Sequence, residues 1–469
     1  MHDRVKPITR RQIPAVGRIL EAVGRCDLPR PVVVDAIRRK LSRIRAAREV
    51  PDFESIVTLV RHSIDELRTS KLQPIINGTG IVIHTNFGRA PLVSEAVRAA
   101  NEIGSSYSNL EYDLAAGERG GRGGYIENAL ALLCGAEAAT VVNNCAAALV
   151  LIVRHFTGTK TDVVISRGEL VQIGGGFRIG EIIETTGAKL REVGATNKTT
   201  LDDYAGAIGP NTAMILKVHR SNFFMSGFVE SPSSKEISAL ARKKRVPFVE
   251  DLGSGAVVAT EQLGIADHEP TAAEVLKSGV DVTCFSGDKL FGGPQAGIIA
   301  GKKRLIAALK REPLFRALRS DKLCLAALQA TVDLHLDQAT AGIPTLALLR
   351  VSESELRRRA TAICSRLQEL PLKITIGCGK AKVGGGTLPK SNLSSVTIDI
   401  TPKNPSLADF AATLRASSPP VIGYIADGCF KLDLRTIFPR QDALVVEAIR
   451  AACRKTRHHE DREGHEDGI

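Results

Sequence analysis

Lys289 lies in the stretch SGDKLFGGPQAG, between two apolar runs rich in β-branched residues. The first run, VDVTCFSG (280–287), predicts a buried strand, so Lys289 is expected just past its carboxyl end. Open α/β sheets bind ligands at that edge. A lysine beside apolar walls has a lowered pKa and forms Schiff bases, and Ser286 offers a hydroxyl to a phosphate. The alternative for a lysine in a loop is a solvent-exposed side chain.

Two acidic residues, Glu250 and Asp251, end the apolar run VPFVED (246–251). Adjacent strand residues face opposite sides of a sheet, so only one of the two carboxylates can point toward a ligand. A buried carboxylate there can pair with the pyridinium nitrogen of pyridoxal phosphate (PLP), which makes that cofactor an electron sink. The alternative is an acid that caps the following turn.

The stretch ATVVNNCAAALVL (139–151) predicts a strand that ends at Asn143 and Asn144, followed by an alanine-rich helix from Cys145. Free N–H groups and the positive end of the helix dipole suit a phosphate. The alternative is an ordinary helix with an asparagine cap. Along the chain, the start of this helix comes first, then Asp251 at the end of a strand, then Lys289 at the end of another. This is the order found in aminotransferase-like (fold type I) PLP enzymes, and the three features together indicate that class more specifically than any one of them.

The surrounding sequence alternates short apolar runs with helical stretches, which predicts a mainly parallel α/β sheet covered on both faces. The predicted strands are at 139–142, 162–168, 189–194, 213–219, 246–251, 280–287 and 296–301. Beyond about residue 345 a smaller α+β domain is expected, with a helix at 352–370, strands at 391–400 and 429–437, and a last helix. The predicted organisation is a helical module at 1–71, a PLP-binding large domain at 72–345, a small domain at 346–455 and a disordered tail at 456–469.

The N-terminal module is basic, since residues 1–71 hold 16 Lys and Arg against 9 Asp and Glu, within a chain of net charge +12. Its apolar residues recur at helical spacing, and Asp52 is placed to cap the helix that begins at Phe53. A basic module predicts a polyanionic partner such as a nucleic acid. The alternative is a solvated helical face.

Composition places the chain among cytosolic globular proteins. The apolar run AAALVLIV (146–153) is too short to cross a bilayer, and the N-terminus has no apolar segment of the kind that secretory signals carry. The 9 cysteines are scattered without a CxxC pair or metal-ligand spacing, so reduced thiols and no metal site are expected.

Over residues 8–445 the chain resembles the bacterial selenocysteine synthases, the L-seryl-tRNA(Sec) selenium transferases. The matching stretches are INGTGIVIHTNFGRAPL (76–92), NLEYDLAAGERGGR (109–122), AEAATVVNNCAAA (136–148), VVISRGELVQIGGGFRI (163–179), VGATNKT (193–199), LKVHRSNFFMSGF (216–228), EDLGSGA (250–256), SGDKLFGGPQAGIIAGKK (286–303), RALRSDKLCLAAL (316–328) and VIGYIADGCFKLDLRTI (421–437). Several of these motifs are long and unusual.

The resemblance implies that Lys289 binds PLP covalently and that Asp251 pairs with its pyridine nitrogen. It also implies that Ser286 and the turn Asn143, Asn144 and Cys145 hold the phosphate. The family usually has a third asparagine where Cys145 stands. Phosphate binding through backbone N–H groups would survive that difference, whereas a side-chain amide contact would not.

An anion site is also implied at Arg89, Arg316 and Arg319, with Asp288 nearby. Because Arg316 and Arg319 are three residues apart, we expect them to share one helix face. Guanidinium groups match phosphate-type oxygens with paired hydrogen bonds. The glycine-rich loop that carries Arg119 and Arg122 is a weaker candidate for the same site.

The activity implied by the resemblance is conversion of L-seryl-tRNA(Sec) to L-selenocysteinyl-tRNA(Sec), with selenophosphate as donor and an aminoacrylyl-tRNA intermediate. The basic module would contact tRNA(Sec) bound to a neighbouring subunit, in a homo-oligomer of dimers forming a larger ring, a decamer. One competing hypothesis is a small-molecule PLP lyase or β-replacement enzyme, which the basic module disfavours. Another is a non-catalytic tRNA-binding protein, which Asp251 and Lys289 disfavour.

Overall fold

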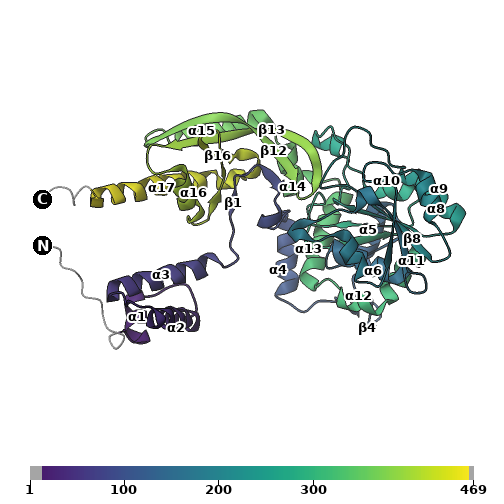
Figure 1. The fold of residues 1–469 in the computed structure, drawn as a ribbon, viewed down its shortest axis with the longest axis horizontal. Helices are drawn as coiled ribbons and strands as arrows, with labels where there is room; N and C mark the ends of the chain where they lie inside the picture. The colour runs from purple at the N-terminus through teal and green to yellow at the C-terminus, as the bar shows by residue number, and fades with distance from the viewer. Residues whose placement is uncertain (1–12, 464–469) are drawn as a thin grey trace. The chain divides into compact units, whose positions relative to one another are not determined.

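The computed structural model describes residues 13–463. The chain separates into two compact units, one of Met1–Ile75 with Ala412–Pro420 and one of Ile76–Ala411 with Val421–Ile469. Figure 1 labels many of the helices and strands of both. The first unit thus extends slightly past residue 71, where the sequence suggested a boundary.

The N-terminal unit contains the helices α1 (Val16–Val23), α2 (Arg30–Ala46) and α3 (Phe53–Thr69), drawn in purple in Figure 1. Their apolar stripes pack together into a separate aliphatic core, which includes Ile19, Ile37 and Ile56. Asp52 caps α3, as predicted, because its side chain accepts a hydrogen bond of 2.7 Å from the amide of Ser55. The helical spacing in the sequence is therefore explained by a local core.

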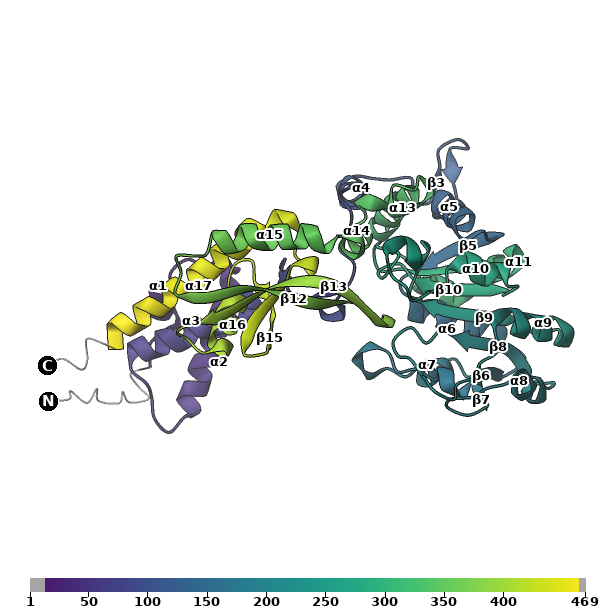
Figure 2. The ribbon, with the colours of Figure 1, turned by 90° about the horizontal axis from the view of Figure 1, so that it is seen from above.

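A seven-stranded sheet forms the centre of the second unit, in the order β5-β11-β10-β9-β8-β6-β7. Its strands are β5 (Ala138–Val142), β6 (Asp162–Ser166), β7 (Lys189–Val193), β8 (Thr212–Val218), β9 (Phe248–Gly253), β10 (Val282–Ser286) and β11 (Gly297–Gly301). Every neighbouring pair is parallel except the two pairs that involve β11. Figure 2 shows β10, β9, β8, β6 and β7 in succession. The predicted mainly parallel α/β sheet is confirmed.

Helices cover both faces of this sheet, because its strands bury apolar side chains in two directions. Phe248 belongs to the core on one face and Val249 to the core on the other. The first face is covered by α5 (Gly124–Cys134), α8 (Leu201–Ala207), α9 (Ser234–Lys244), α10 (Ala272–Lys277) and α13 (Lys322–Leu336). The second face is covered by α6 (Cys145–Phe156), α7 (Ile179–Glu184) and α11 (Lys303–Arg311). This layering leaves the strand ends free to carry a site.

A five-stranded sheet follows in the order β15-β16-β13-β12-β2. Its strands are β2 (Ile81–Ile83), β12 (Leu372–Gly384), β13 (Thr387–Pro402), β15 (Tyr424–Ala426) and β16 (Cys429–Asp433). Two short pairs are β1 (Ile76–Asn77) with β14 (Val421–Ile422) and β3 (Tyr112–Asp113) with β4 (Glu118–Arg119). The remaining helices are α4 (Ser94–Gly104), α12 (Pro313–Ala317), α14 (Pro344–Arg350), α15 (Glu353–Ser365), α16 (Leu407–Arg415) and α17 (Asp442–Glu463).

The structure differs from the sequence predictions near the C-terminus. Strand β12 was not predicted, and β16 ends at Asp433, where a 3-10 turn replaces the expected continuation to residue 437. The expected disordered tail at 456–469 is helical as far as Glu463, and residues 464–469 lie outside the described residues. Between residues 13 and 463, no helix is both long and apolar enough to span a bilayer.

Candidate active site

Lys289 follows strand β10, as predicted, and its side chain turns back toward the end of β9. Its Nζ donates a hydrogen bond of 3.0 Å to the carbonyl oxygen of Gly253. Gly253 has a φ of +63°, a backbone conformation that favours glycine, and it ends β9. A methyl group built on Gly253 would lie 3.8 Å from Lys289 Nζ and 3.9 Å from Asp251 Oδ1. The amine and the carboxylate therefore flank the same small space.

Of the two acids on β9, Asp251 is the one that lies beside the lysine. Burial raises the pKa of its carboxyl group, and the charge of Lys289 is the largest opposing influence. Glu250 faces the opposite side of the sheet, is 2% exposed, and has its pKa raised mainly by burial. The alternation of side chains along β9 therefore decides which of the two acids points toward a ligand. Asp251 is the carboxylate available to a ligand next to Lys289.

The first turn of α6 lies at the carboxyl end of β5. The Asn144 side chain caps the helix by accepting a hydrogen bond of 2.8 Å from the amide of Ala147. The amides of Cys145 and Ala146 then lack intrahelical partners, as first-turn amides do. Gly297 on β11 permits the close approach of this turn, because a built Cβ would lie 2.1 Å from the Asn144 carbonyl oxygen. The helix start therefore has the features that bind a phosphate.

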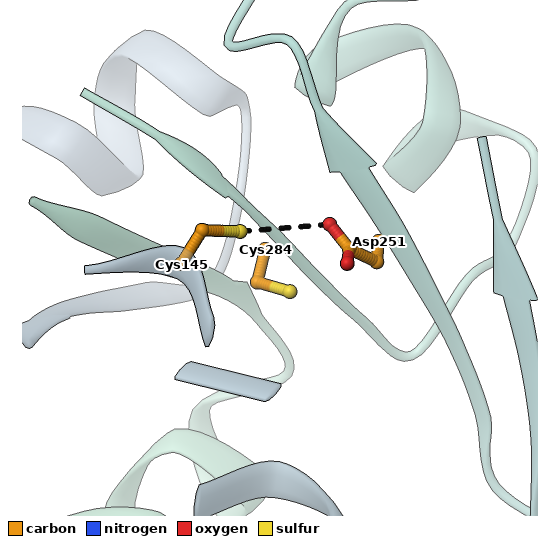
Figure 3. A group of neighbouring side chains, drawn as sticks. All are labelled: Cys145, Asp251 and Cys284. Atoms are coloured by element: carbon orange, nitrogen blue, oxygen red, sulfur yellow. Dashed lines mark hydrogen bonds between the residues drawn. The ribbon is translucent and has the colours of Figure 1, made fainter. Parts of the chain in front are cut away.

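Cys145 directs its side chain toward the acid of the site. Its Sγ lies 3.5 Å from Asp251 Oδ1, and Cys284 stands beside Asp251 on the neighbouring strand (Figure 3). Ligand atoms of the three side chains lie within 4.8 Å of one another. The hydrogen bond with Cys145, followed by burial, raises the pKa of the Cys284 thiol. Two thiols and a carboxylate could ligate a metal ion, although Asp251 also belongs to the lysine site.

Arg89 and Asp288 form an ion pair next to the lysine. Arg89 Nη1 lies 2.7 Å from Asp288 Oδ2, and the carboxylate is only 8% exposed. The backbone amide of Ala90 donates to the carbonyl oxygen of Asp288 at 3.2 Å. Arg89 itself has a φ of 64°. These contacts hold the loop between β2 and α4 against the residue that precedes Lys289.

The other arginines are arranged differently from our expectation. Helix α12 ends at Ala317, so Arg319 lies in the turn beyond it, and the prediction of a shared helix face was wrong. Arg316 is exposed and has no ion pair within the described residues. Arg319 Nη1 lies 3.1 Å from Glu111 Oε1. The expected anion-binding arginines are therefore not gathered into one contact network.

Glu111, which the sequence analysis did not identify, joins three arginines. It contacts Arg119 at 3.0 Å, Arg122 at 3.0 Å and Arg319 at 3.1 Å. The hydrogen bond from Arg122 is the largest cause of its lowered pKa. The cluster adjoins the turn before α6, since the amide of Asn143 donates to the carbonyl oxygen of Leu318 at 2.9 Å. An acid beside arginines within the motif NLEYDLAAGERGGR was the available signal.

The geometry fits PLP. Lys289 supplies an amine for the aldehyde, Asp251 a carboxylate for the pyridine nitrogen, and the α6 turn free amides for the phosphate. Ser286 is buried at the end of β10, and its carbonyl oxygen lies 2.3 Å from a Cβ built on Gly255. Gly255 therefore allows the chain after β9 to pack closely against the end of β10. This sheet order and these three groups define a fold type I PLP-dependent enzyme.

Comparison with known proteins identifies the family. The L-seryl-tRNA selenium transferase family matches residues 75–438. The L-seryl-tRNA(Sec) selenium transferase of Geotalea uraniireducens is 44% identical over 460 residues, which cover 95% of this chain and 99% of the relative. That of Aquifex aeolicus is 41% identical over 434 residues, covering 91% and 95%. The chain belongs to the L-seryl-tRNA(Sec) selenium transferases, and its cofactor is PLP.

A solved structure supports the fold independently. D-glucosaminate-6-phosphate ammonia-lyase superposes with a TM-score of 0.58 at 21% identity, covering 82% of this chain and 97% of the lyase. At that identity the likeness concerns the fold alone. The hypothesis of a small-molecule lyase therefore gains nothing from it, whereas the sequence relatives favour the transferase.

Proposed function

We propose that this protein converts L-seryl-tRNA(Sec) to L-selenocysteinyl-tRNA(Sec) in the cytoplasm, with selenophosphate as the selenium donor. The observation that carries the proposal is the meeting of Lys289 and Asp251 at Gly253, in a chain of this family. The serine hydroxyl group is replaced by selenium, and phosphate is the second product. The serine Cβ exchanges its bond to oxygen for a bond to selenium, and the donor's phosphorus exchanges its bond to selenium for a bond to oxygen.

PLP supplies an electron sink that makes the Cα–H bond of the bound serine acidic. Lys289 is the base within reach, and we assign its Nζ to remove the Cα proton and later to return it. The hydrogen bond to the Gly253 carbonyl oxygen orients this amine. Asp251 keeps a proton on the pyridine nitrogen, an arrangement that requires its carboxyl group to be ionised. Burial raises the pKa of Asp251, and the hydrogen bond of 3.5 Å from the Cys145 thiol opposes that effect and favours the ionised carboxylate.

The donor's oxyanion is assigned to Arg89, Arg316 and Arg319, with Asp288 positioning Arg89. The 2.7 Å ion pair with Asp288 fixes the Arg89 guanidinium near the residue that precedes Lys289. Glu111 restrains Arg319, while Arg316 is exposed and free to turn toward an anion. Guanidinium groups suit a phosphate-type oxyanion because they donate paired hydrogen bonds. Arg119 and Arg122 remain weaker candidates.

The three-helix N-terminal unit is assigned to tRNA(Sec). The serine moiety is common to all seryl-tRNAs, so discrimination must come from the RNA. Exposed guanidinium groups on α2, at Arg38, Arg43 and Arg45, have no ion pair among the described residues. Basic side chains of this kind bind RNA through its phosphates and shape.

We also propose that the protein forms a homo-oligomer in which dimers assemble into a decameric ring. Large apolar side chains are exposed around the β3–β4 hairpin and the helices beside it, namely Val97, Tyr107, Leu114, Tyr125 and Leu132. Large exposed apolar side chains are candidate contacts between subunits. Mass measurement in solution tests this, and Leu132→Glu is expected to shift the assembly toward smaller species.

Two measurements test the catalytic assignment. The purified protein is expected to show the absorption band of lysine-bound PLP, and Lys289→Ala to lose that band. The wild type is expected to form selenocysteinyl-tRNA from seryl-tRNA(Sec) and selenophosphate. A wild-type protein without the band, even after added PLP, would contradict the assignment of Lys289. A protein that shows the band but forms no selenocysteinyl-tRNA would contradict the proposed substrate.

The tRNA assignment is tested by binding at several salt concentrations. Replacing Arg38, Arg43 and Arg45 by Ala is expected to weaken tRNA(Sec) binding and to flatten the dependence of log K on log[salt] by about 2 units. The control replaces Arg357 by Ala, an exposed arginine on α15 paired with Glu353. Equal losses in the two proteins would contradict the role of α2.

A further inference from the structure

A cavity of about 450 Å³ lies beside the proposed catalytic lysine. Its walls come from the end of β8 and the loop after it, from loops that precede α9 and α10, and from the start of β13. This volume lies in the range of small-molecule sites. None of the residues expected to bind PLP or the selenium donor lines it.

The cavity is connected to the lysine through one short segment of chain. His219 lines the cavity, and its amide donates a hydrogen bond of 2.8 Å to the carbonyl oxygen of Asp251. Ser221, two residues further on, places its hydroxyl oxygen 3.6 Å from a methyl group built on Gly253. The same methyl would lie 3.8 Å from Lys289 Nζ. A group bonded to the reacting amino acid could therefore extend into the cavity.

Two buried carboxylates face this cavity. The Glu269 side chain is 3% exposed, and its Oε1 approaches His219 Nε2 to 3.2 Å without a hydrogen bond in the described structure. Glu169 is also 3% exposed and accepts a hydrogen bond of 3.0 Å from the amide of Val218. Buried carboxylates with spare acceptor capacity favour ligand hydroxyl or amino donors in their part of the cavity.

The lining of the cavity also includes an aromatic ring and cations. Phe224 is 53% exposed, and Lys390 Nζ lies 5.0 Å from the centre of its ring. Arg220 lines the same cavity and has no ion pair among the described residues. An exposed ring stacks on a nucleobase through the face that Lys390 does not cover, and the cations beside it suit a phosphodiester. Stacking surface, hydroxyl acceptors and phosphate-binding cations together are the requirements of a nucleotide.

From this arrangement we infer that the cavity binds the 3′-terminal adenosine of the aminoacyl-tRNA, with the base on Phe224 and the ribose toward Glu269. The inference rests on the proposed function, since the serine of that substrate is esterified to the terminal ribose. Arg220 and Lys390 face the phosphate that precedes this nucleoside. The cavity then positions the seryl group over Lys289 independently of the contacts that the N-terminal unit makes with the tRNA body.

The test measures binding of two small probes to the full-length holoenzyme by calorimetry. One probe is the 5′-phosphate of 3′-seryl-amino-3′-deoxyadenosine, in which an amide replaces the labile ester, and the other is L-serinamide. The nucleotide probe is expected to bind at least tenfold more tightly. Phe224→Ala is expected to remove most of that advantage, and Glu269→Gln or Lys390→Ala a part of it.

Phe228→Ala is the matched control, because Phe228 is 86% exposed and does not line the cavity. Equal affinity for the two probes, or an equal loss in the Phe228 variant, would overturn the inference. Lys390→Ala, at an exposed position, covers the case in which the Phe224 variant does not fold. If the wild type converts seryl-tRNA(Sec) while the nucleotide probe has no advantage, only the adenosine site fails. If it does not convert seryl-tRNA(Sec), the proposed function fails.

Discussion

The Cys145 thiol lies 3.5 Å from Asp251 Oδ1 and acts as a hydrogen-bond donor to the carboxylate proposed to hold the pyridine nitrogen. This contact lowers the pKa of Asp251, against the larger effect of burial. The side chain at this helix start therefore serves the acid, while the backbone amides stay available to the phosphate. The Cys145 side chain therefore has a defined structural role.

Cys145→Ala is expected to weaken PLP binding by the apoenzyme about threefold to tenfold, because one donor to the Asp251 carboxylate is lost. Cys145→Ser retains a donor and is expected to stay close to the wild type. Titration of apoenzyme with PLP, followed by absorbance, measures the dissociation constants. Cys378→Ala, at an exposed cysteine, is the control. An alanine variant with wild-type affinity would remove Cys145 from the cofactor site.

Glu169 predicts a pH dependence of stability. Burial raises the pKa of its carboxyl group to about 7, above the value of about 4.3 for unfolded chains. The folded protein therefore holds this proton more tightly, and the resulting stability is present at acidic pH and lost as pH rises through about 7. Glu169→Gln removes this loss, by up to about 3 kcal/mol.

Thermal unfolding of the wild type and Glu169→Gln at several pH values measures the effect. We expect similar melting temperatures at or below about pH 4 and a higher one for the variant near pH 8. Comparing the two proteins cancels the contribution of Asp251, whose pKa is also raised by burial. The charge of Glu250 raises the pKa of Glu169, so the difference between the two proteins includes that interaction. A difference that is constant across pH would show that Glu169 does not titrate in this range.

The Arg89–Asp288 ion pair predicts a strongly asymmetric double-mutant cycle. Arg89→Ala leaves the buried Asp288 carboxylate without its cation and is expected to cost about 3 kcal/mol of stability. Asp288→Asn removes the charge and should cost less, and the double variant should be more stable than Arg89→Ala alone. Denaturant unfolding of the holoenzyme measures all four proteins. Additive losses would mean that the two side chains do not interact.

Much of the large sheet was predictable because its strands are continuous apolar runs. Strand β12 was missed, and its glycines explain why. A Cβ built on Gly377 would lie 2.6 Å from Asp399 Oδ2, and one on Gly379 would lie 2.8 Å from Asp433 Oδ2. These glycines leave room for the Asp399 side chain of the neighbouring strand β13 and for the Asp433 side chain at the end of β16. In the sequence they only weaken the strand pattern.

The candidate site also has a part that the sequence predicts and a part that it does not. Lys289, Asp251 and the α6 turn follow recognisable strands, so their meeting at one edge could be predicted from parallel topology. The contact of Arg319 with Glu111 spans 208 positions of sequence. It depends on where the β3–β4 hairpin lies, which no local pattern specifies. The same holds for Glu269 and His219, whose pairing requires two loops to meet.

Arg359 in α15 is expected to anchor the last helix, α17. Its guanidinium is paired with Asp442 at 2.6 Å and 3.1 Å and also donates to the carbonyl oxygen of Ile437 at 2.7 Å. The side chain is 5% exposed, so Arg359→Ala leaves an acid and a carbonyl group unpaired and is expected to cost about 3 to 5 kcal/mol. Arg359→Lys should recover only part of the lost stability, because an ammonium cannot reproduce the paired contact.

Hydrogen exchange of the α17 amides and chemical denaturation measure the loss of stability. The control is Arg358→Ala, at an exposed neighbour that is paired with Glu355. If the two alanine variants lose equal stability, the Arg359 network does not anchor α17.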